Sequence, residues 1–283
     1  MSYFKETIPV AIPILIGLGF TFGVHSYSKA DTTQRLEQIA LKRAQEEDAQ
    51  AQRQASFDES LNASVKADAA RDAEITAQEN AKNKEAEKAA LIAALPGDPA
   101  QGKGNYMTCM ACHGQKAEGQ RMLNAPRLAD QTPWYTKRQL IKFKEGVRGV
   151  HPQDVLGMQM APMAKLLFND AAVDNVVAYI ATLDPGKPAD RGKGDPAKGK
   201  AAYAICATCH GPKAQGNEVQ KAPKLTGQHA WYMAKQLKNF KEGVRGTHAQ
   251  DEEGRLMGPM AKTLQDDGAI DDLIAYIQSL NDE

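Results

Sequence analysis

The chain has only four cysteines among its 283 residues and no excess of charge of either sign. All four cysteines lie in two short motifs, so none remains for a disulfide elsewhere. The 35 basic and 35 acidic residues cancel, so neither nucleic acid nor a strongly acidic partner is indicated. Aromatic residues make up 6% of the sequence, and no stretch alternates between polar and apolar residues. The low aromatic content and the lack of alternating segments predict an all-α protein.

One apolar run near the N-terminus lacks charged residues. It extends from Ile8 to Val24, with Lys5 before it and Lys29 after it. The run is at the short end for a membrane-spanning helix, and we expect residues 1–30 to form an inner-membrane anchor. A cleaved signal peptide that ends at the Ser-Lys-Ala sequence of residues 28–30 is the alternative.

Residues 31–95 contain neither glycine nor proline. Alanine, glutamate, glutamine and lysine dominate this segment, and all four are strong helix formers. Large apolar residues are too few for the sustained seam of a coiled coil. We therefore predict a solvated polar helix that serves as a tether and ends before Pro96-Gly97.

Two pentapeptides share the pattern Cys-x-x-Cys-His, which is the attachment signature of c-type haem. Each thiol can add to a haem vinyl group, and the histidine can become the proximal iron ligand. A thioredoxin-like pair would not require the histidine, and zinc knuckles usually lie about 15–20 residues apart. The motifs predict two covalently bound haem c groups, and such attachment implies export to the periplasm. The predicted haem-binding residues are Cys109, Cys112, His113, Cys206, Cys209 and His210.

The chain after Pro96 repeats itself at a constant offset of 97 residues. Residues 143–149 read Phe-Lys-Glu-Gly-Val-Arg-Gly and recur unchanged at 240–246. A period this long that occurs twice indicates duplicated domains. The predicted organisation is a first domain at 96–184, a linker at 185–194 and a second domain at 195–283.

Each repeat contains three predicted helices. The first leads into the haem motif, the second ends at a glycine, and the third has apolar residues at three-and-four spacing. The second and third helices are expected at 134–145 and 171–183, and at 231–242 and 269–280 in the second copy.

The distal iron ligand must come from a residue type present in both repeats. The candidates are Met160 with Met257, Met163 with Met260, and His151 with His248. Met158 is excluded because Arg255 stands at its equivalent position. A flexible methionine in a loop before the last helix can reach over the haem, and thioether ligation raises the reduction potential relative to two histidines. This favours the methionines, with the first of each pair ahead and the second as the alternative ligand.

These features resemble class I cytochrome c domains, and their tandem resembles the cytochrome c4 family of two-haem electron carriers. Besides the haem motifs, the resemblance rests on the Pro126-Arg-Leu and Pro223-Lys-Leu segments, the methionine segments and the closing Ala-Tyr-Ile helices. It implies that Met160 and Met257 are the distal ligands. It also implies that the carbonyls of Pro126 and Pro223 accept hydrogen bonds from the proximal histidines, which would orient the imidazole rings.

The resemblance also implies a function without a small-molecule substrate. Single electrons would pass between respiratory membrane complexes on the periplasmic side, such as a quinol-oxidising complex and a terminal oxidase. A cytochrome subunit of a larger oxidase or dehydrogenase complex is the first alternative. A di-haem enzyme, such as a peroxidase or a thiosulfate-oxidising cytochrome, would need an open iron position or an unusual ligand such as cysteine, and no cysteine remains. The N-terminal membrane segment and the polar helix depart from the family pattern.

Overall fold

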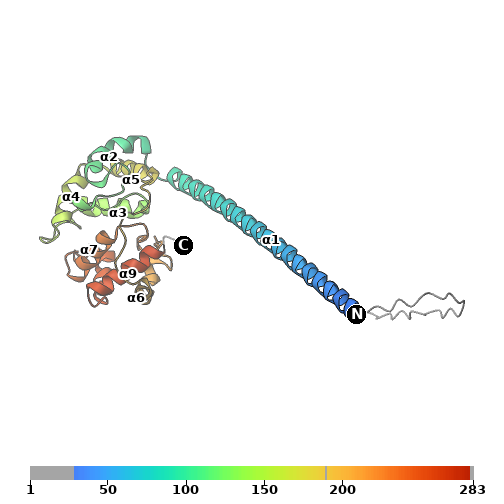
Figure 1. Cartoon of the computed structure of the whole chain (residues 1–283). Coiled ribbons are helices and arrows are strands. Elements are labelled where there is room, and N and C mark those ends of the chain that lie inside the picture. The colour runs from blue at the N-terminus through green and yellow to red at the C-terminus, as the bar shows by residue number, and fades with distance from the viewer. Residues whose placement is uncertain (1–28, 189, 281–283) are drawn as a thin grey trace, which may run out of the picture. The chain divides into compact units, whose positions relative to one another are not determined.

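The computed structural model describes residues 29–188 and 190–280. This part of the chain forms nine α-helices and one short 3-10 helix, without a β-strand, so the all-α prediction is confirmed (Figure 1). None of the described helices is long and apolar enough to cross a membrane. The predicted anchor at 1–30 has its whole apolar run, Ile8 to Val24, outside the described residues, and only Lys29 and Ala30 are described, as the start of the first helix.

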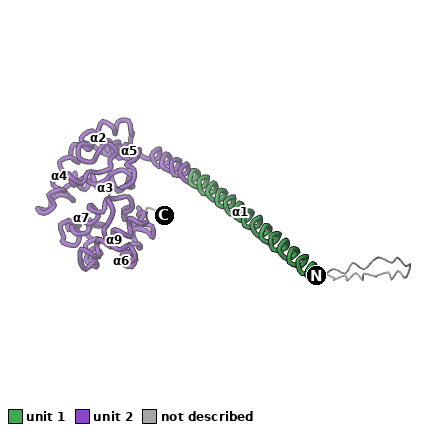
Figure 2. The backbone as a smooth tube through the Cα atoms, viewed as in Figure 1, with its two compact units in different colours: residues 1–79 green, residues 80–283 purple. Residues whose placement is uncertain are grey.

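Contacts divide the chain into two units, residues 1–79 and residues 80–283 (Figure 2). The helix α1 (Lys29–Ala93) begins in the first unit, and no residue of it is buried. It contains no glycine or proline and ends shortly before Pro96, as the sequence predicts. The helix is therefore maintained by the propensity of its residues and not by a packed face.

Each haem-motif domain in the second unit is built from four α-helices. In the first domain, Asp98 caps α2 by accepting a hydrogen bond from Ala100 N, and Pro99 occupies the first turn. The first domain comprises α2 (Pro99–His113), the 3-10 helix η1 (Arg121–Leu123), α3 (Pro133–Lys144), α4 (Val155–Lys165) and α5 (Asp170–Thr182). The second comprises α6 (Pro196–His210), α7 (Ala230–Lys241), α8 (Glu252–Lys262) and α9 (Asp267–Ser279). All four α-helices recur at the 97-residue offset, so the duplication seen in the sequence is also a structural one.

The prediction of three helices per domain was wrong, because the methionine segments are helical and not loops. Asp154 caps α4 by accepting a hydrogen bond from Gly157 N at 3.1 Å. Pro162 lies inside this helix and removes one backbone donor, which is why the sequence resembled a loop. The second domain has the same arrangement, with Asp251 as the cap of α8 and Pro259 inside it.

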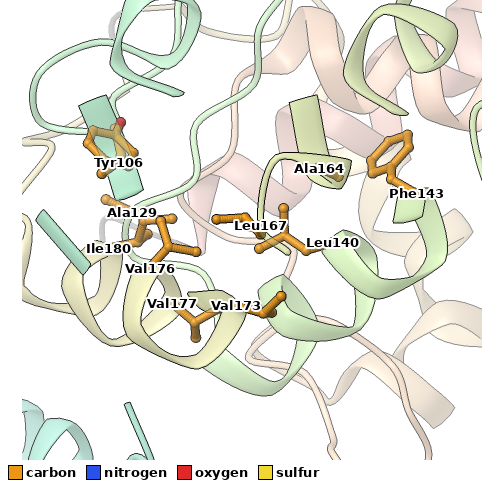
Figure 3. Packing of buried hydrophobic residues seen from close by; sticks show 11 residues of the cluster. Tyr106, Ala129, Leu140, Phe143, Ala164, Leu167, Val173, Val176, Val177 and Ile180 are labelled. Atoms are coloured by element: carbon orange, nitrogen blue, oxygen red, sulfur yellow. The ribbon is translucent and has the colours of Figure 1, made fainter. Parts of the chain in front are cut away.

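The core of the first domain lies where α5 meets α2 and α3. Figure 3 shows apolar side chains of α5 gathered with Leu140 of α3 and Leu167, which precedes α5. Val173 and Val176 are at most 1% exposed, and Tyr106 of α2 packs in the same cluster. The second domain has an equivalent cluster around Ile270, Leu273 and Tyr203. Each core therefore fixes the helix that ends in a Cys-x-x-Cys-His motif.

A glycine permits the closest approach between the first and last helices of each domain. A Cβ atom added at Gly102 of α2 would lie 1.9 Å from the carbonyl oxygen of Asn175 in α5. In the second domain, a Cβ atom at Gly199 would lie 1.9 Å from the Asp272 carbonyl oxygen. Since the obstacle is backbone, the helices themselves must move to admit a side chain.

Replacing Gly102 with alanine is expected to destabilise the first domain by about 1–3 kcal/mol or more, because the substitution overpacks a helix crossing. Gly104, in the same helix, has no atom within 4 Å of an added Cβ, so Gly104→Ala is the matched control. The control should be neutral or stabilising by up to about 1 kcal/mol, since alanine is the better helix former. Urea unfolding of the two variants checks this. Equal midpoints for both would contradict the close crossing.

Candidate haem sites and the interface between them

Both cysteines and the histidine of each motif lie at the C-terminal end of a helix. In the first domain Cys109 is half-buried, Cys112 is exposed and His113 is buried at the C-terminus of α2. The second domain repeats this pattern with Cys206, Cys209 and His210 at the end of α6. None of the four thiols forms a disulfide. In the described part of the chain, no three His, Cys, Asp or Glu side chains come together in a group that could hold a metal ion.

The loop after each motif places a proline carbonyl against the histidine ring. His113 Nδ1 donates to the Pro126 carbonyl at 2.8 Å, and His210 Nδ1 donates to the Pro223 carbonyl at the same distance. Tyr106 is a core residue that holds the start of the loop, because its hydroxyl donates to the Gly114 carbonyl at 2.7 Å. The Nδ1 bond leaves the Nε2 lone pair of each imidazole for a metal.

Burial lowers the pKa of His113 and of His210, against the opposing effect of the proline carbonyls. Each ring is therefore neutral at pH 7, as a metal ligand must be. Burial raises the pKa of the Cys109 and Cys206 thiols, so these thiols are protonated in the absence of haem.

The methionines of each pair differ in burial. Met160 is half-buried on α4 and packs against the first core cluster, whereas Met163 is 38% exposed. Met160 falls between buried Gly157 and Ala164 at three-and-four spacing, so it lies on the inner face of the helix. In α8 the half-buried residue is likewise Met257, and Met260 is 38% exposed.

The structure joins the two domains through residues to which the sequence assigned no role. Arg148 donates to the Tyr232 hydroxyl at 3.1 Å and to Gln236 Oε1 at 3.3 Å. Arg245 donates to the Tyr135 hydroxyl and to Gln139 Oε1, both at 3.1 Å. Each contact has its counterpart 97 residues away, so the interface has the reciprocal pattern of a two-fold arrangement. The one sequence feature that pointed to this interface is the segment at 143–149, which recurs unchanged at 240–246 and contains both arginines.

The two arginines of the interface change the pKa of Tyr135. Burial opposes ionisation of the phenol, but the charges of Arg245 and Arg148 together hold the pKa of Tyr135 below its ordinary value. Trp134 and Trp231 each make an edge-to-face contact with the tyrosine that follows them.

One charged cluster breaks the two-fold pattern. Lys142 of α3 is hydrogen-bonded to Asp251 and, at 2.8 Å, to Glu253, and Arg138 also pairs with Glu253. The positions equivalent to Lys142 and Glu253 hold Asn239 and Leu156. Burial opposes ionisation of Glu253, but Lys142 and Arg138 lower its pKa overall. A lowered pKa stabilises docking at neutral pH, and this contribution is lost as the pH falls through the lowered value.

The donor set of each domain fits a haem c group. Two thiols three positions apart on a helical turn can form the two thioether bonds, and a buried neutral imidazole presents Nε2. A thioether on the inner face of a second helix completes the set. The second domain supplies the same donors.

The family model described as "Cytochrome c" matches the chain twice, at residues 99–184 and 196–281. Cytochrome c4 from Azotobacter vinelandii is 32% identical over 200 residues, which cover 67% of this chain and 92% of the relative. A protein from Stutzerimonas stutzeri named "Thiosulfate dehydrogenase electron acceptor" is 30% identical, covering 63% of this chain and 86% of the relative. The solved structure of Acidithiobacillus ferrooxidans cytochrome c4 is 28% identical, with a TM-score of 0.50, and the match covers 62% of this chain and 99% of that one.

The double family match, the two Cys-x-x-Cys-His helices and the relatives along the duplicated region agree. The chain belongs to the cytochrome c family and is a di-haem electron carrier similar to cytochrome c4, with two covalently bound haem c groups.

Proposed function

We propose that both irons are six-coordinate, with His113 and Met160 as the axial ligands in the first domain and His210 and Met257 in the second. The observation that carries this proposal is the repeated geometry: in each domain a buried imidazole donates Nδ1–H to a proline carbonyl at 2.8 Å. A half-buried methionine on the inner face of α4 or α8 supports the choice within each pair. Two saturated irons leave no position for a substrate, which fits a carrier and not an enzyme.

Each haem, when bound, supplies one-electron chemistry by cycling between ferrous and ferric iron. The residues of the chain determine the potential and the rate. The proline carbonyls fix the imidazole orientation and raise ligand basicity. The reciprocal interface holds the two domains together, so that an electron can pass from one haem to the other while the domains stay docked.

The proposed setting is the periplasmic face of the inner membrane, with a quinol-oxidising complex and a terminal oxidase as redox partners. The segment at 1–30 would provide the membrane anchor, and the helical segment at 31–95 the tether. The second candidate function is that of a cytochrome subunit in a larger complex. The relative named "Thiosulfate dehydrogenase electron acceptor" favours it. A partner that co-purifies stoichiometrically in mild detergent would favour the subunit. A mature protein that begins at Asp31 would contradict the anchor.

The oxidised protein is expected to show the weak near-infrared sulfur-to-iron band of methionine ligation at an intensity for two haems per chain. Both irons should be low-spin, because every axial position is filled. Visible and near-infrared spectroscopy with a redox titration checks this. A high-spin signal from either haem would overturn the assignment of a carrier without a vacant iron.

A further inference from the structure

We infer that Gln228, a residue of the second domain, is a positioning residue for the haem of the first domain, acting through the Pro126–Arg127 peptide on His113. This inference rests on the proposed ligand role of His113. It makes the properties of haem 1, the haem of the first domain, depend on docking of the second domain.

The argument starts from one peptide group that is held at both ends. The oxygen of this group is the Pro126 carbonyl, which accepts from His113 Nδ1 at 2.8 Å. Its N–H belongs to Arg127 and donates to Gln228 Oε1 at 3.2 Å. Gln228 Nε2 also donates to the Arg127 carbonyl at 2.9 Å, which fixes the amide orientation. A continuous chain of hydrogen bonds therefore leads from Gln228 to the imidazole.

Such a chain polarises the peptide. An acceptor on the N–H increases the negative charge on the carbonyl oxygen of the same planar amide, and hydrogen bonds in series strengthen one another. A stronger acceptor at Nδ1–H makes the imidazole a more basic ligand and stabilises ferric iron. Gln228 should therefore lower the potential of haem 1.

Gln228 is itself held firmly at the interface. The next residue, His229, donates Nε2–H to the Glu118 carbonyl of the first domain at 2.7 Å. His229 Nδ1 lies 2.6 Å from the carboxylate of Asp190 in the linker. Gln228 Oε1 also accepts from His229 N at 3.1 Å. These contacts tie the glutamine to docking of the two domains.

The two-fold counterpart lacks the critical link. Gln131 Nε2 donates to the Lys224 carbonyl at 3.0 Å, as Gln228 does to Arg127. Gln131 Oε1 accepts from Thr132 N at 2.8 Å, as Gln228 Oε1 does from His229 N. Its other donor is the Thr132 hydroxyl, at 3.1 Å. Among the described residues it makes no bond to Lys224 N, so the peptide that binds His210 is not polarised in this way. The coupling is one-sided, and Gln131 offers a matched control.

The test uses the full holoprotein, with the midpoint potential of each haem followed separately by NMR of its ferric methyl resonances. Gln228→Leu should raise the potential of haem 1 and leave unchanged that of haem 2, the haem of the second domain. It should also speed solvent exchange of the His113 Nδ1–H, because the Pro126 carbonyl that holds this proton becomes a weaker acceptor. Gln131→Leu should leave both potentials in place.

Gln228→Glu separates positioning from a merely structural role. The carboxylate keeps an acceptor for Arg127 N–H and polarises the peptide more strongly, so the haem 1 potential should fall below that of the parent. A structural defect would move the leucine and glutamate variants in the same direction. Gln131→Glu places an equal charge across the interface. An equal fall at haem 2 in that control would mean through-space charge alone and would overturn the inference.

Unmoved potentials in Gln228→Leu would also overturn it. That failure is distinct from failure of the proposed function, in which the unmodified protein would lack the near-infrared band or show high-spin iron.

Discussion

Replacing Met160 with alanine is expected to remove about half of the near-infrared sulfur-to-iron band, since only one of two equivalent haems loses its thioether. The potential of haem 1 should fall by about 0.1 V or more, within the roughly 0.8 V that axial ligands span. Met257→Ala should have the same effect on haem 2. Near-infrared spectra and redox titrations of the two variants provide the measurement.

Met163→Ala is the matched control, because Met163 lies one turn further along the same helix and is 38% exposed. The control should keep the whole band, and so should Met260→Ala in the second domain. If the band is lost in the Met163 variant and kept in the Met160 variant, the assignment within each pair is reversed.

The all-α fold class, the two tandem domains and the two covalent haems were predictable because each has a clear signal in the sequence. Cysteine and histidine spacing defines the attachment helix, and the 97-residue offset makes every element of one domain a guide to the other. The hydrogen bonds of Pro126 and Pro223 to the histidines were implied by the resemblance to the family and are present in the structure.

The helical state of the methionine segments could not be predicted because two local signals conflict. Pro162 argues for a break, since it lacks a backbone donor. The Asp154 cap and the burial of Gly157 and Ala164 outweigh this loss in the folded domain. Burial of that kind depends on α3, which packs against α4 and is absent from any local window of sequence.

The interface was not predictable, because its partners are far apart in sequence. Arg148 and Gln236 are separated by 88 residues and carry no spacing rule. The repeat of residues 143–149 at 240–246 marked both arginines, but equal residues in two domains could have served each domain separately. The ion pair of Lys142 and Glu253 could not be predicted either, because the repeat does not mark it. The equivalent positions in the other domain hold Asn239 and Leu156, which carry no charge.

Replacing Lys142 with methionine is expected to weaken domain docking by about 3–5 kcal/mol, because it leaves a buried carboxylate without its partner. The side chains of Lys142 and Asp251 are only 9% and 4% exposed. Lys187, Arg191 and Lys193 of the linker at 185–194 are already exposed, but a protease needs the segment to extend. Separation of the domains frees the linker to do so, and cleavage there tracks the open population. Trypsin should therefore cut between the domains at least about 100-fold faster than in the parent. Haem staining of gels reports the cut, since each fragment keeps one covalent haem.

Lys238→Met is the control for simple loss of a lysine, since Lys238 forms an ion pair with Asp267 in the same domain, whose side chain is 76% exposed. A surface pair contributes at most about 1 kcal/mol, so linker cleavage should stay near the parent rate. Adding Asp251→Asn to Lys142→Met removes the unpaired carboxylate and keeps a good cap for α8. The double variant should therefore be cut more slowly than Lys142→Met alone. If the double variant is cut as fast as the single one, the cost lies in lost packing. If Lys142→Met itself is cut at the parent rate, the cluster does not hold the domains together.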